Sequence, residues 1–293
     1  MSLTGLLFGT ELIEILQGLF APQFDSIFES ISLLGSDAVL VALSSMIYWC
    51  LDKRRGRTVT YVLFMGAYLN FFLKFLVPWP RPPVEYHIVE KSEIQHGFPS
   101  GHAQDSATFW SWIGLDFRKR ILPILGMVIV VAVGLSRIYL GVHYPGQVIG
   151  GWIIGVAVAG LGMVFLRRLP FRMNEMQAIP QVSFAFVALV PILVAIGLGA
   201  VGEVNPGHIG GYLFGFSLGA LAEDRYVRFK TEITSAKRIL RVVVGSATTG
   251  FFVLVLDSIL PETDMITGFI NAVMRGLTVV VIAPAIFKVI ERG

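Results

Sequence analysis

The sequence of 293 residues has little charge and almost no cysteine. Charged side chains make up 15% of it and hydrophobic ones 55%, whereas soluble domains carry about 25% charged residues. A soluble globular fold is therefore a poor interpretation. The single cysteine, Cys50, excludes an internal disulfide framework and a cysteine-rich metal site. The sequence also lacks tandem repeats, nucleotide-binding glycine motifs and clusters of metal ligands.

What the chain has instead is a series of apolar runs, each close to the length of a membrane span. A helix of about 20 apolar residues crosses a bilayer and satisfies its own backbone hydrogen bonds. The predicted fold class is therefore all-α, a polytopic transmembrane bundle of about nine spans. The predicted spans cover residues 37–51, 58–77, 99–115, 121–141, 146–166, 182–201, 208–222, 239–257 and 267–287.

Basic residues gather in every second loop of this plan. The positive-inside rule places those loops in the cytoplasm, the N-terminus outside and the C-terminus inside. All five histidines then map to the outer side: His87, His96, His102, His143 and His208. The basic set holds eighteen of the 23 lysines and arginines: Lys53, Arg54, Arg55, Arg57, Arg118, Lys119, Arg120, Arg167, Arg168, Arg172, Arg225, Arg228, Lys230, Lys237, Arg238, Arg241, Lys288 and Arg292.

Two regions are predicted on either side of a polar loop. Residues 1–172 form a catalytic membrane core that includes an N-terminal segment, and residues 173–293 form a four-helix membrane extension of unknown role. Residues 1–36 carry acidic side chains among apolar ones at helical spacing. This spacing fits a helix that lies at the outer membrane interface, or one that faces a partner.

The first segment that carries chemistry runs from Lys74 to Pro82. Three prolines within five residues cannot continue a helix, so the second span should end near Val77 and a stiff, extended loop should follow. Lys74 and Arg81 lie on either side of this change, and a guanidinium can bind two phosphate oxygens at once. The alternative is an interfacial lysine and a loop arginine, with Trp79 as a membrane-interface anchor.

The second segment is Pro99–Ser100–Gly101–His102, directly before the third predicted span. Ser100 is a good N-cap residue, and exposed backbone N–H groups beside a glycine can cradle a phosphate. His102 then falls in the first helical turn, where it can give a proton to a bound anion or take one. The alternative is a capped helix with an interfacial histidine.

The third segment runs from Ser136 to Gln147. Arg137 lies near the outer end of the fourth predicted span, and Pro145 is suited to start the fifth. His143 precedes Gln147 by about one helical turn, so the Gln147 side-chain carbonyl can accept one ring N–H and leave the other nitrogen bare. A lone histidine would be structural, but three cations and two histidines on one membrane face together favour phosphoryl transfer.

The ordered motifs resemble the type 2 phosphatidic acid phosphatase superfamily, which includes membrane lipid phosphatases, glucose-6-phosphatases and vanadium haloperoxidase-like enzymes. Its pattern is Lys-x6-Arg-Pro, then Pro-Ser-Gly-His, then Ser-Arg-x5-His-x3-Asp. The resemblance covers about residues 37–170, and its one departure is Gln147 at the final aspartate position. The glucose-6-phosphatase branch carries glutamine there and shares the nine spans, outer N-terminus and cytoplasmic C-terminus predicted above.

The resemblance implies a metal-independent mechanism without a cofactor. It makes His143 the nucleophile of a phosphohistidine intermediate, while His102 protonates the leaving oxygen and then helps water hydrolyse the intermediate. Gln147 would orient His143, although an amide cannot supply the negative charge that stabilises an imidazolium. The groups implied to hold the phosphoryl oxygens are Lys74, Arg81, Ser100, Gly101 and Arg137.

The sequence therefore predicts an integral membrane phosphatase whose active site faces away from the cytoplasm. A lipid phosphate or diphosphate, such as a polyprenyl diphosphate, is the preferred substrate, because a site at the bilayer rim can receive a headgroup without extracting the tail. A sugar-phosphate phosphatase of the glucose-6-phosphatase type is the second hypothesis. A transporter that only binds a phosphate or lipid is a third. Membrane lipids are expected partners, and nucleic acid is not.

Three further features leave alternatives open. Asp105, one turn past Gly101, either lines the pocket or forms hydrogen bonds within the bundle. Arg275 in the ninth span either contacts a lipid headgroup or is paired or snorkelling. The glycine-rich run at residues 150–162 favours close helix packing over a ligand loop.

Overall fold

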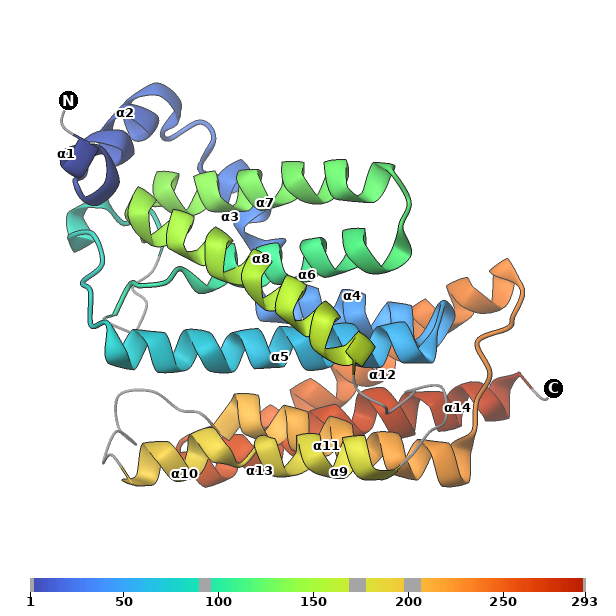
Figure 1. The fold of residues 1–293 in the computed structure, drawn as a ribbon. Coiled ribbons are helices and arrows are strands. Elements are labelled where there is room, and N and C mark those ends of the chain that lie inside the picture. The colour runs from blue at the N-terminus through green and yellow to red at the C-terminus, as the bar shows by residue number, and fades with distance from the viewer. Residues whose placement is uncertain (1–2, 90–95, 169–177, 198–206, 292–293) are drawn as a thin grey trace. The chain divides into compact units, whose positions relative to one another are not determined.

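The computed structural model describes residues 3–89, 96–168, 178–197 and 207–291. Within these ranges the chain forms helices and loops (Figure 1), with one isolated antiparallel bridge between Pro80 and His96. The all-α prediction is therefore confirmed for the described ranges. Arg172 and Arg292 of the basic set, and the end of the sixth predicted span, lie outside them.

The chain divides into two compact units. Unit 1 comprises residues 1–41 and 65–168, and unit 2 comprises residues 42–64 and 169–293. Helices α4 (Asp37–Cys50) and α5 (Lys53–Leu76) each contribute residues to both units. The grouping of residues 42–64 with the C-terminal part has no counterpart in the predicted division at residue 172, which stays a prediction about function.

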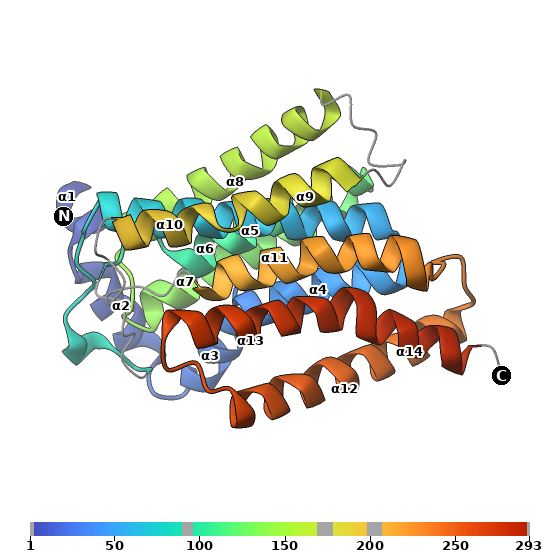
Figure 2. The same cartoon turned by 90° about the horizontal axis from the view of Figure 1, so that it is seen from below.

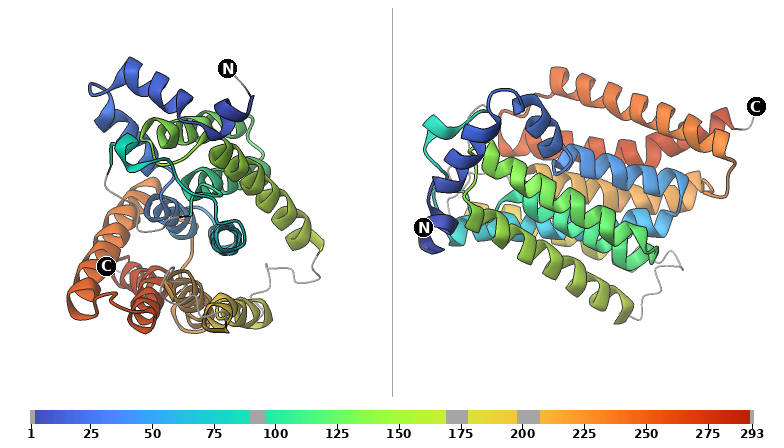
Figure 3. Two further views of the ribbon diagram at one scale, coloured as in Figure 1. Left: turned by 90° about the vertical axis from the view of Figure 1, so that its left-hand side faces the viewer. Right: turned by 90° about the horizontal axis from the view of Figure 1, so that it is seen from above.

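Unit 1 is built around α6 (Gly101–Phe117), which packs against both α7 (Ile121–Tyr139) and α8 (Pro145–Arg168). The C-terminal ends of α5 and α7 and the N-terminal ends of α6 and α8 lie at one end of the unit (Figure 1), and Figure 3, left, faces this end. Besides these helices and its parts of α4 and α5, unit 1 contains α1 (Leu3–Phe8), α2 (Glu11–Phe20), α3 (Asp25–Leu33) and η1 (Val84–Tyr86).

Two glycines let the backbones of α6 and α8 meet. A Cβ on Gly151 would lie 2.8 Å from the carbonyl oxygen of Ser100, and one on Gly155 would lie 2.8 Å from the Ala107 Cβ. Real Cβ contacts are not this short, so larger residues would push the two helices apart. The close packing that the glycine-rich run predicted is confirmed at these two positions.

The N-terminal segment packs on its own chain. Ile13 of α2 is fully buried in a cluster with Ala103, Ile138 and Val148. Gln17 Nε2 donates to two backbone carbonyls, those of Tyr86 and Tyr139, at 2.8 Å each. The amphipathic spacing of this segment therefore serves contacts with α6, α7 and α8, and its position at the membrane interface stays a prediction.

Unit 2 centres on α11 and α13, which lie side by side (Figure 2). Glycines again permit the contact, since a Cβ on Gly276 would lie 2.6 Å from the carbonyl oxygen of Tyr212. Its elements besides α4 and α5 are α9 (Ala178–Val187), α10 (Val190–Gly197), α11 (Gly207–Ala222), the π-helix η2 (Glu223–Val227), α12 (Ser235–Ile259), α13 (Met265–Leu277), the π-helix η3 (Thr278–Ile282) and α14 (Ala283–Ile290).

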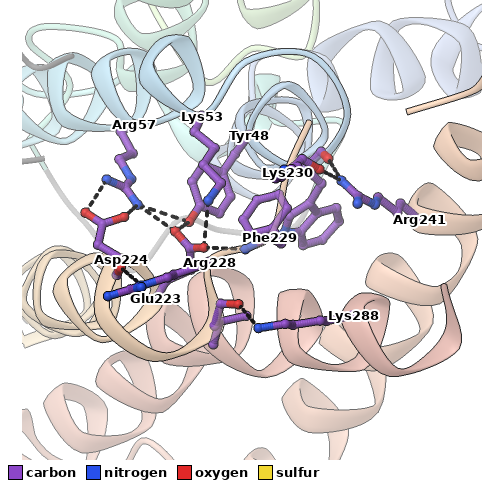
Figure 4. A network of polar contacts seen from close by, with 12 residues as sticks. Tyr48, Lys53, Arg57, Glu223, Asp224, Arg228, Phe229, Lys230, Arg241 and Lys288 are labelled. Carbon is purple, nitrogen blue, oxygen red and sulfur yellow. Dashed lines mark hydrogen bonds and ion pairs between the residues drawn. The ribbon is translucent and has the colours of Figure 1, made fainter. Parts of the chain in front are cut away.

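A buried ionic network joins the start of α5 to η2 inside unit 2 (Figure 4). Glu223, which has no exposed surface, accepts from Lys53 Nζ at 2.7 Å and from Arg57 Nη2 at 2.9 Å. Its carboxylate also accepts from the Tyr48 hydroxyl and the Phe229 backbone N–H. Arg57 also pairs with Asp224, so the two cations face two carboxylates, which is the condition under which buried ions are tolerated.

Arg275 is paired. Its Nη2 lies 2.5 Å from Asp257 Oδ1 and 3.0 Å from Glu262 Oε1. The sequence left open whether Arg275 contacts a lipid headgroup or is paired or snorkelling. The structure shows it paired, with partners that lie in unit 2.

Helices occupy the described part of every predicted span, but the count of nine is not confirmed. In the part of the chain that the structure describes, five helices are long and apolar enough to cross a membrane, or six if α3 and α4, bent by 46°, form one span. The 17 residues of α6 and the 16 of α11 extend about 24–26 Å, less than a hydrocarbon core of about 30 Å. The number of spans and the orientation of the termini stay predictions.

Candidate active site

Three loops meet at the end of unit 1 where α5 and α7 end and α6 and α8 begin. The proline run ends α5 at Leu76, one residue before the predicted position. The Gly97 N–H donates to the Trp79 carbonyl at 2.6 Å, and the Ser100 N–H donates to the Gln147 carbonyl at 3.1 Å. These backbone bonds hold all three predicted segments together.

His143 is buried and its ring is oriented by Gln147. The ring Nδ1 lies 3.1 Å from Gln147 Oε1, as the four-residue spacing predicted. Gln147 Nε2 donates to the Pro80 carbonyl at 2.7 Å, so the amide oxygen is the end that faces the histidine. Nδ1 therefore carries the proton, and Nε2 carries the lone pair.

Arg81 gives the same tautomer by an independent argument. Its Nη1 lies 3.0 Å from His143 Nε2 and also donates to the Val142 carbonyl at 3.0 Å. A guanidinium has donors only, so Nε2 must be the acceptor. Burial lowers the pKa of Arg81 to about 10, which leaves the guanidinium charged at neutral pH.

The surroundings of His143 keep its imidazole neutral. Burial holds the pKa of His143 well below its ordinary value, and the positive charges of Arg81, Arg137 and Lys74 lower it further. The hydrogen bond to Gln147 acts in the opposite direction and is the weakest of these effects. An unprotonated nitrogen is what a nucleophile requires.

Two buried donors near these cations have no hydrogen-bond partner among the described residues: the Ser100 hydroxyl and Arg137 Nε. Ser100 is the N-cap residue of α6, as predicted, but its side chain makes no capping bond. Buried polar groups are nearly always satisfied, and exceptions call for an explanation such as a ligand. A phosphoryl group, with acceptor oxygens only, suits both donors.

Lys74 and Asp105 are both buried near the first turn of α6. Lys74 is 8% exposed and Asp105 is 5% exposed, and their charges interact. A Cβ on Gly101 would lie 3.9 Å from Asp105 Oδ2. Lys74 is thus not a solvent-exposed interfacial lysine. Asp105 lies beside Gly101 and Lys74, and its role as a pocket residue stays a prediction.

His102 lies in the first turn of α6, within reach of the charges of Arg137, Lys74 and Arg81. Trp79, proposed as an alternative membrane anchor, packs its ring against those of Phe8 and Phe98, with centroids 4.5 and 5.7 Å apart.

All eight predicted site residues belong to unit 1: Lys74, Arg81, Ser100, Gly101, His102, Arg137, His143 and Gln147.

Two family models match the sequence. One, described as the PAP2 superfamily, matches residues 55–171, and another, described as the PAP2 superfamily phosphatase transmembrane extension, matches residues 208–292. The chain belongs to the PAP2 superfamily. PAP2 phosphatases hydrolyse phosphate esters, and with its long apolar helices this chain is an integral membrane member of the family.

Several PAP2 phosphatases share part of the sequence. Glucose-6-phosphatase 3 of Mus musculus is 28% identical over 175 residues, which cover 51% of this chain and 50% of that protein. Phosphatidylglycerophosphatase B of Bacillus subtilis is 29% identical over 148 residues, 46% of this chain and 71% of that protein. The chain thus spans about half the length of the mouse relative.

A solved structure is also similar to part of this chain. The crystal structure of the first transmembrane PAP2 type phosphatidylglycerolphosphate phosphatase from Bacillus subtilis has a TM-score of 0.49 and 26% identity. It covers 56% of this chain and 87% of that chain.

Sequence reasoning missed four groups that support the PAP2 motifs. Gly97 lies against Gln147, since a Cβ there would come within 2.6 Å of Oε1. Asn70 Nδ2 donates to the Pro99 carbonyl at 3.3 Å and to Gln104 Oε1 at 3.0 Å, and Gln104 Nε2 donates to the Gly66 carbonyl at 2.7 Å. The fourth, Ser32, binds Arg137. Only the polar character of Asn70 and Gln104 within apolar runs was a signal.

Among the described residues, no three histidine, cysteine, aspartate or glutamate side chains gather as metal ligands. The donors of the PAP2 site are cationic and neutral groups, which suit an anion.

Proposed function

We propose that this chain is an integral membrane phosphatase that hydrolyses a lipid phosphate or diphosphate through a phosphohistidine at His143. The observation that carries the proposal is the oriented lone pair of His143 Nε2 beside Arg81. The two unsatisfied donors at Ser100 and Arg137 support it.

The first step forms a bond between His143 Nε2 and phosphorus, and the bond from phosphorus to the leaving oxygen breaks. The negative charge of the bound phosphate favours the protonated form of His102, which then gives its proton to that oxygen, so a neutral alcohol or a protonated phosphate leaves. Lys74, Arg81, Ser100, Arg137 and the Gly101 N–H bind the non-bridging oxygens, where charge develops in the transition state.

The second step returns the enzyme to its starting form. His102, now neutral, takes a proton from a water molecule as that water attacks phosphorus. The bond between nitrogen and phosphorus breaks, His143 regains its lone pair, and inorganic phosphate leaves. No metal ion or cofactor takes part in either step.

Arg81 has to leave His143 before the attack. Its Nη1 is 3.0 Å from Nε2, the attacking atom, and a nitrogen whose lone pair accepts a hydrogen bond is a poor nucleophile. Ionised phosphoryl oxygens are stronger acceptors than a neutral imidazole. A substrate phosphate therefore draws the guanidinium to itself and uncovers the nucleophile.

The end of α5 supports a lipid substrate. Phe75, Leu76 and Val77 are 40%, 70% and 37% exposed, directly after Lys74 in the sequence. An acyl or prenyl tail can lie against such apolar side chains while its headgroup contacts the cations. The charge asymmetry of the loops supports a site on the extracytoplasmic face, and the relative in Bacillus subtilis is a phosphatidylglycerophosphatase by name.

A sugar phosphate is the second candidate. Gln147 stands at the aspartate position of the family pattern, where the resemblance described above gives the glucose-6-phosphatase branch a glutamine, and the mouse relative is a glucose-6-phosphatase by name. The two candidates differ in whether a long tail contributes to binding.

The test uses detergent-purified full-length protein and measures phosphate release from polyprenyl diphosphate, phosphatidate, phosphatidylglycerophosphate and glucose 6-phosphate, with EDTA present. His143→Ala should abolish release. The matched control is His208→Ala, because His208 is paired with Glu262 in unit 2. We expect wild-type and control proteins to prefer the lipid substrates.

Preference for glucose 6-phosphate would replace the lipid with the sugar phosphate. Equal release by His143→Ala would refute the phosphohistidine mechanism. Absence of release from all four compounds would point to a protein that binds or transports a phosphorylated ligand.

A further inference from the structure

The bend between α3 and α4, residues 32–37, lies against the site although it precedes all of the sequence motifs. It falls outside the stretch matched by the PAP2 family model, which begins at residue 55. The axes of α3 and α4 differ by 46° across it. The bend contacts two of the residues assigned to the reaction, Arg137 and His102.

Ser32 accepts a hydrogen bond from one nitrogen of Arg137. The Arg137 Nη1 donates to Ser32 Oγ at 2.6 Å, and Ser32 is 4% exposed. Nε of the same guanidinium is buried without a hydrogen-bond partner among the described residues. Because the guanidinium is planar and rigid, a bond at Nη1 fixes the direction in which its Nε edge points.

Helix α3 is held firmly on α7, the helix that carries Arg137. The Tyr139 hydroxyl donates to Asp25, and the rings of Phe28 and Tyr139 stack with centroids 3.9 Å apart at 21°. Asp25, Phe28 and Ser32 are spaced three and four residues apart, so they share the face of α3 that packs on α7. These contacts therefore hold Ser32 in place relative to α7, so that its hydrogen bond can orient the Arg137 guanidinium.

Gly35 brings the bend against the catalytic turn of α6. A Cβ at this position would lie 2.8 Å from the His102 carbonyl oxygen and 3.3 Å from the His102 Cβ. Any larger residue would push the bend or His102 out of place. The charge of Asp37, at the end of the bend, also acts on Lys74.

We propose that the α3–α4 bend is a fourth component of the active site, in which Ser32 is a positioning residue that directs the Nε edge of Arg137 toward the phosphoryl group. The inference rests on the proposed function only in assuming that a phosphoryl group binds there. It assigns a role to an N-terminal segment that the three motifs do not include.

The experiment compares Ser32→Ala with Ser30→Ala. Ser30 lies on the same helix, but it is exposed and its hydroxyl donates to the Ser26 carbonyl. Binding of inorganic phosphate to the full-length protein in detergent is followed by phosphorus NMR, and hydrolysis of the best substrate is measured in parallel. A hydrogen bond to a charged group is worth enough that Ser32→Ala should weaken phosphate binding about tenfold.

Rescue separates positioning from general stability. Ser32→Thr keeps the hydroxyl and should bind phosphate as the wild type does. In an Arg137→Lys background the planar guanidinium is absent, so Ser32→Ala should cause no further loss of phosphate binding. If Ser32→Ala does not accumulate, Ser32→Cys takes its place, because a thiol is a weak acceptor of similar size.

The inference would be overturned if Ser32→Ala bound phosphate as well as Ser30→Ala does. It would also be overturned if Ser32→Ala weakened phosphate binding as much in the Arg137→Lys background as in the wild type. The same binding measurement in His143→Ala keeps the two proposals apart. Hydrolysis that survives His143→Ala would refute the proposed mechanism, while a Ser32 effect on phosphate binding in that variant would still support the role of the bend.

Discussion

Replacing Gln147 with glutamate tests whether His143 acts as a neutral nucleophile oriented by an amide. Gln147 is fully buried, and the two side chains have the same length. The exchange removes the donor to the Pro80 carbonyl, now at 2.7 Å, and places a negative charge at the oxygen 3.1 Å from His143 Nδ1.

Two effects follow, and they differ in kind. A negative charge at hydrogen-bond distance should raise the pKa of His143 by about 1–3 units, against the burial and the three cations that now hold it down. The protonated imidazole cannot attack, so kcat/KM falls as the pH drops through this pKa. Raising the pKa therefore moves the fall to higher pH. Separately, the Pro80 carbonyl loses its donor, which costs about 1–3 kcal/mol of folding stability.

The assay is the pH dependence of kcat/KM across the acidic and neutral range, with one substrate for all variants so that the substrate's own ionisation cancels. The matched control is Gln17→Glu, which also removes donors to two backbone carbonyls but does not contact His143. We expect both variants to lose thermal stability and only Gln147→Glu to shift the acidic limb. An unmoved limb in Gln147→Glu, or an equal shift in the control, would refute the reasoning.

Three further substitutions have defined outcomes. Arg81→Lys loses the guanidinium that the proposed mechanism places on the phosphoryl oxygens, so initial rates should show kcat/KM lower by about 10²-fold; a rate near that of the wild type would contradict the assigned role. Gly97→Ala places a methyl group 2.6 Å from Gln147 Oε1 and should lower kcat about tenfold with KM little changed, which steady-state kinetics would check. Glu223→Gln removes the charge that pairs with Lys53 and Arg57, so the protein should lose about 3 kcal/mol of stability and unfold at lower temperature, with unchanged activity per folded molecule.

The sequence was a good guide wherever the deciding contact is local. The prolines after Val77 predict the end of α5, and a cap residue followed by glycine predicts the start of α6. The contact between His143 and Gln147 spans one helical turn, so its spacing alone predicts it.

Contacts between distant segments could not be predicted in this way. Gln147 and Pro80 are 67 residues apart, and Arg137 and Ser32 are 105 residues apart. Their meeting depends on how whole helices pack, which a hydropathy pattern does not encode. The same limit explains why the count of nine spans is not confirmed. A hydropathy pattern treats the apolar run of α6 as a membrane span, whereas in the fold α6 is a short helix that packs against α7 and α8.

The glycine contacts between α6 and α8 also bear on how this scaffold can change over generations. Gly151 and Gly155 tie the helix that carries Ser100 and His102 to the helix that begins just after His143. Under the proposed mechanism, a mutation that widens this seam would separate His102 from His143 and so lower turnover. Substitutions in the surrounding loops, such as the segment that includes η1, leave the seam intact. A mutagenesis library aimed at new substrates should keep the seam constant and vary that segment.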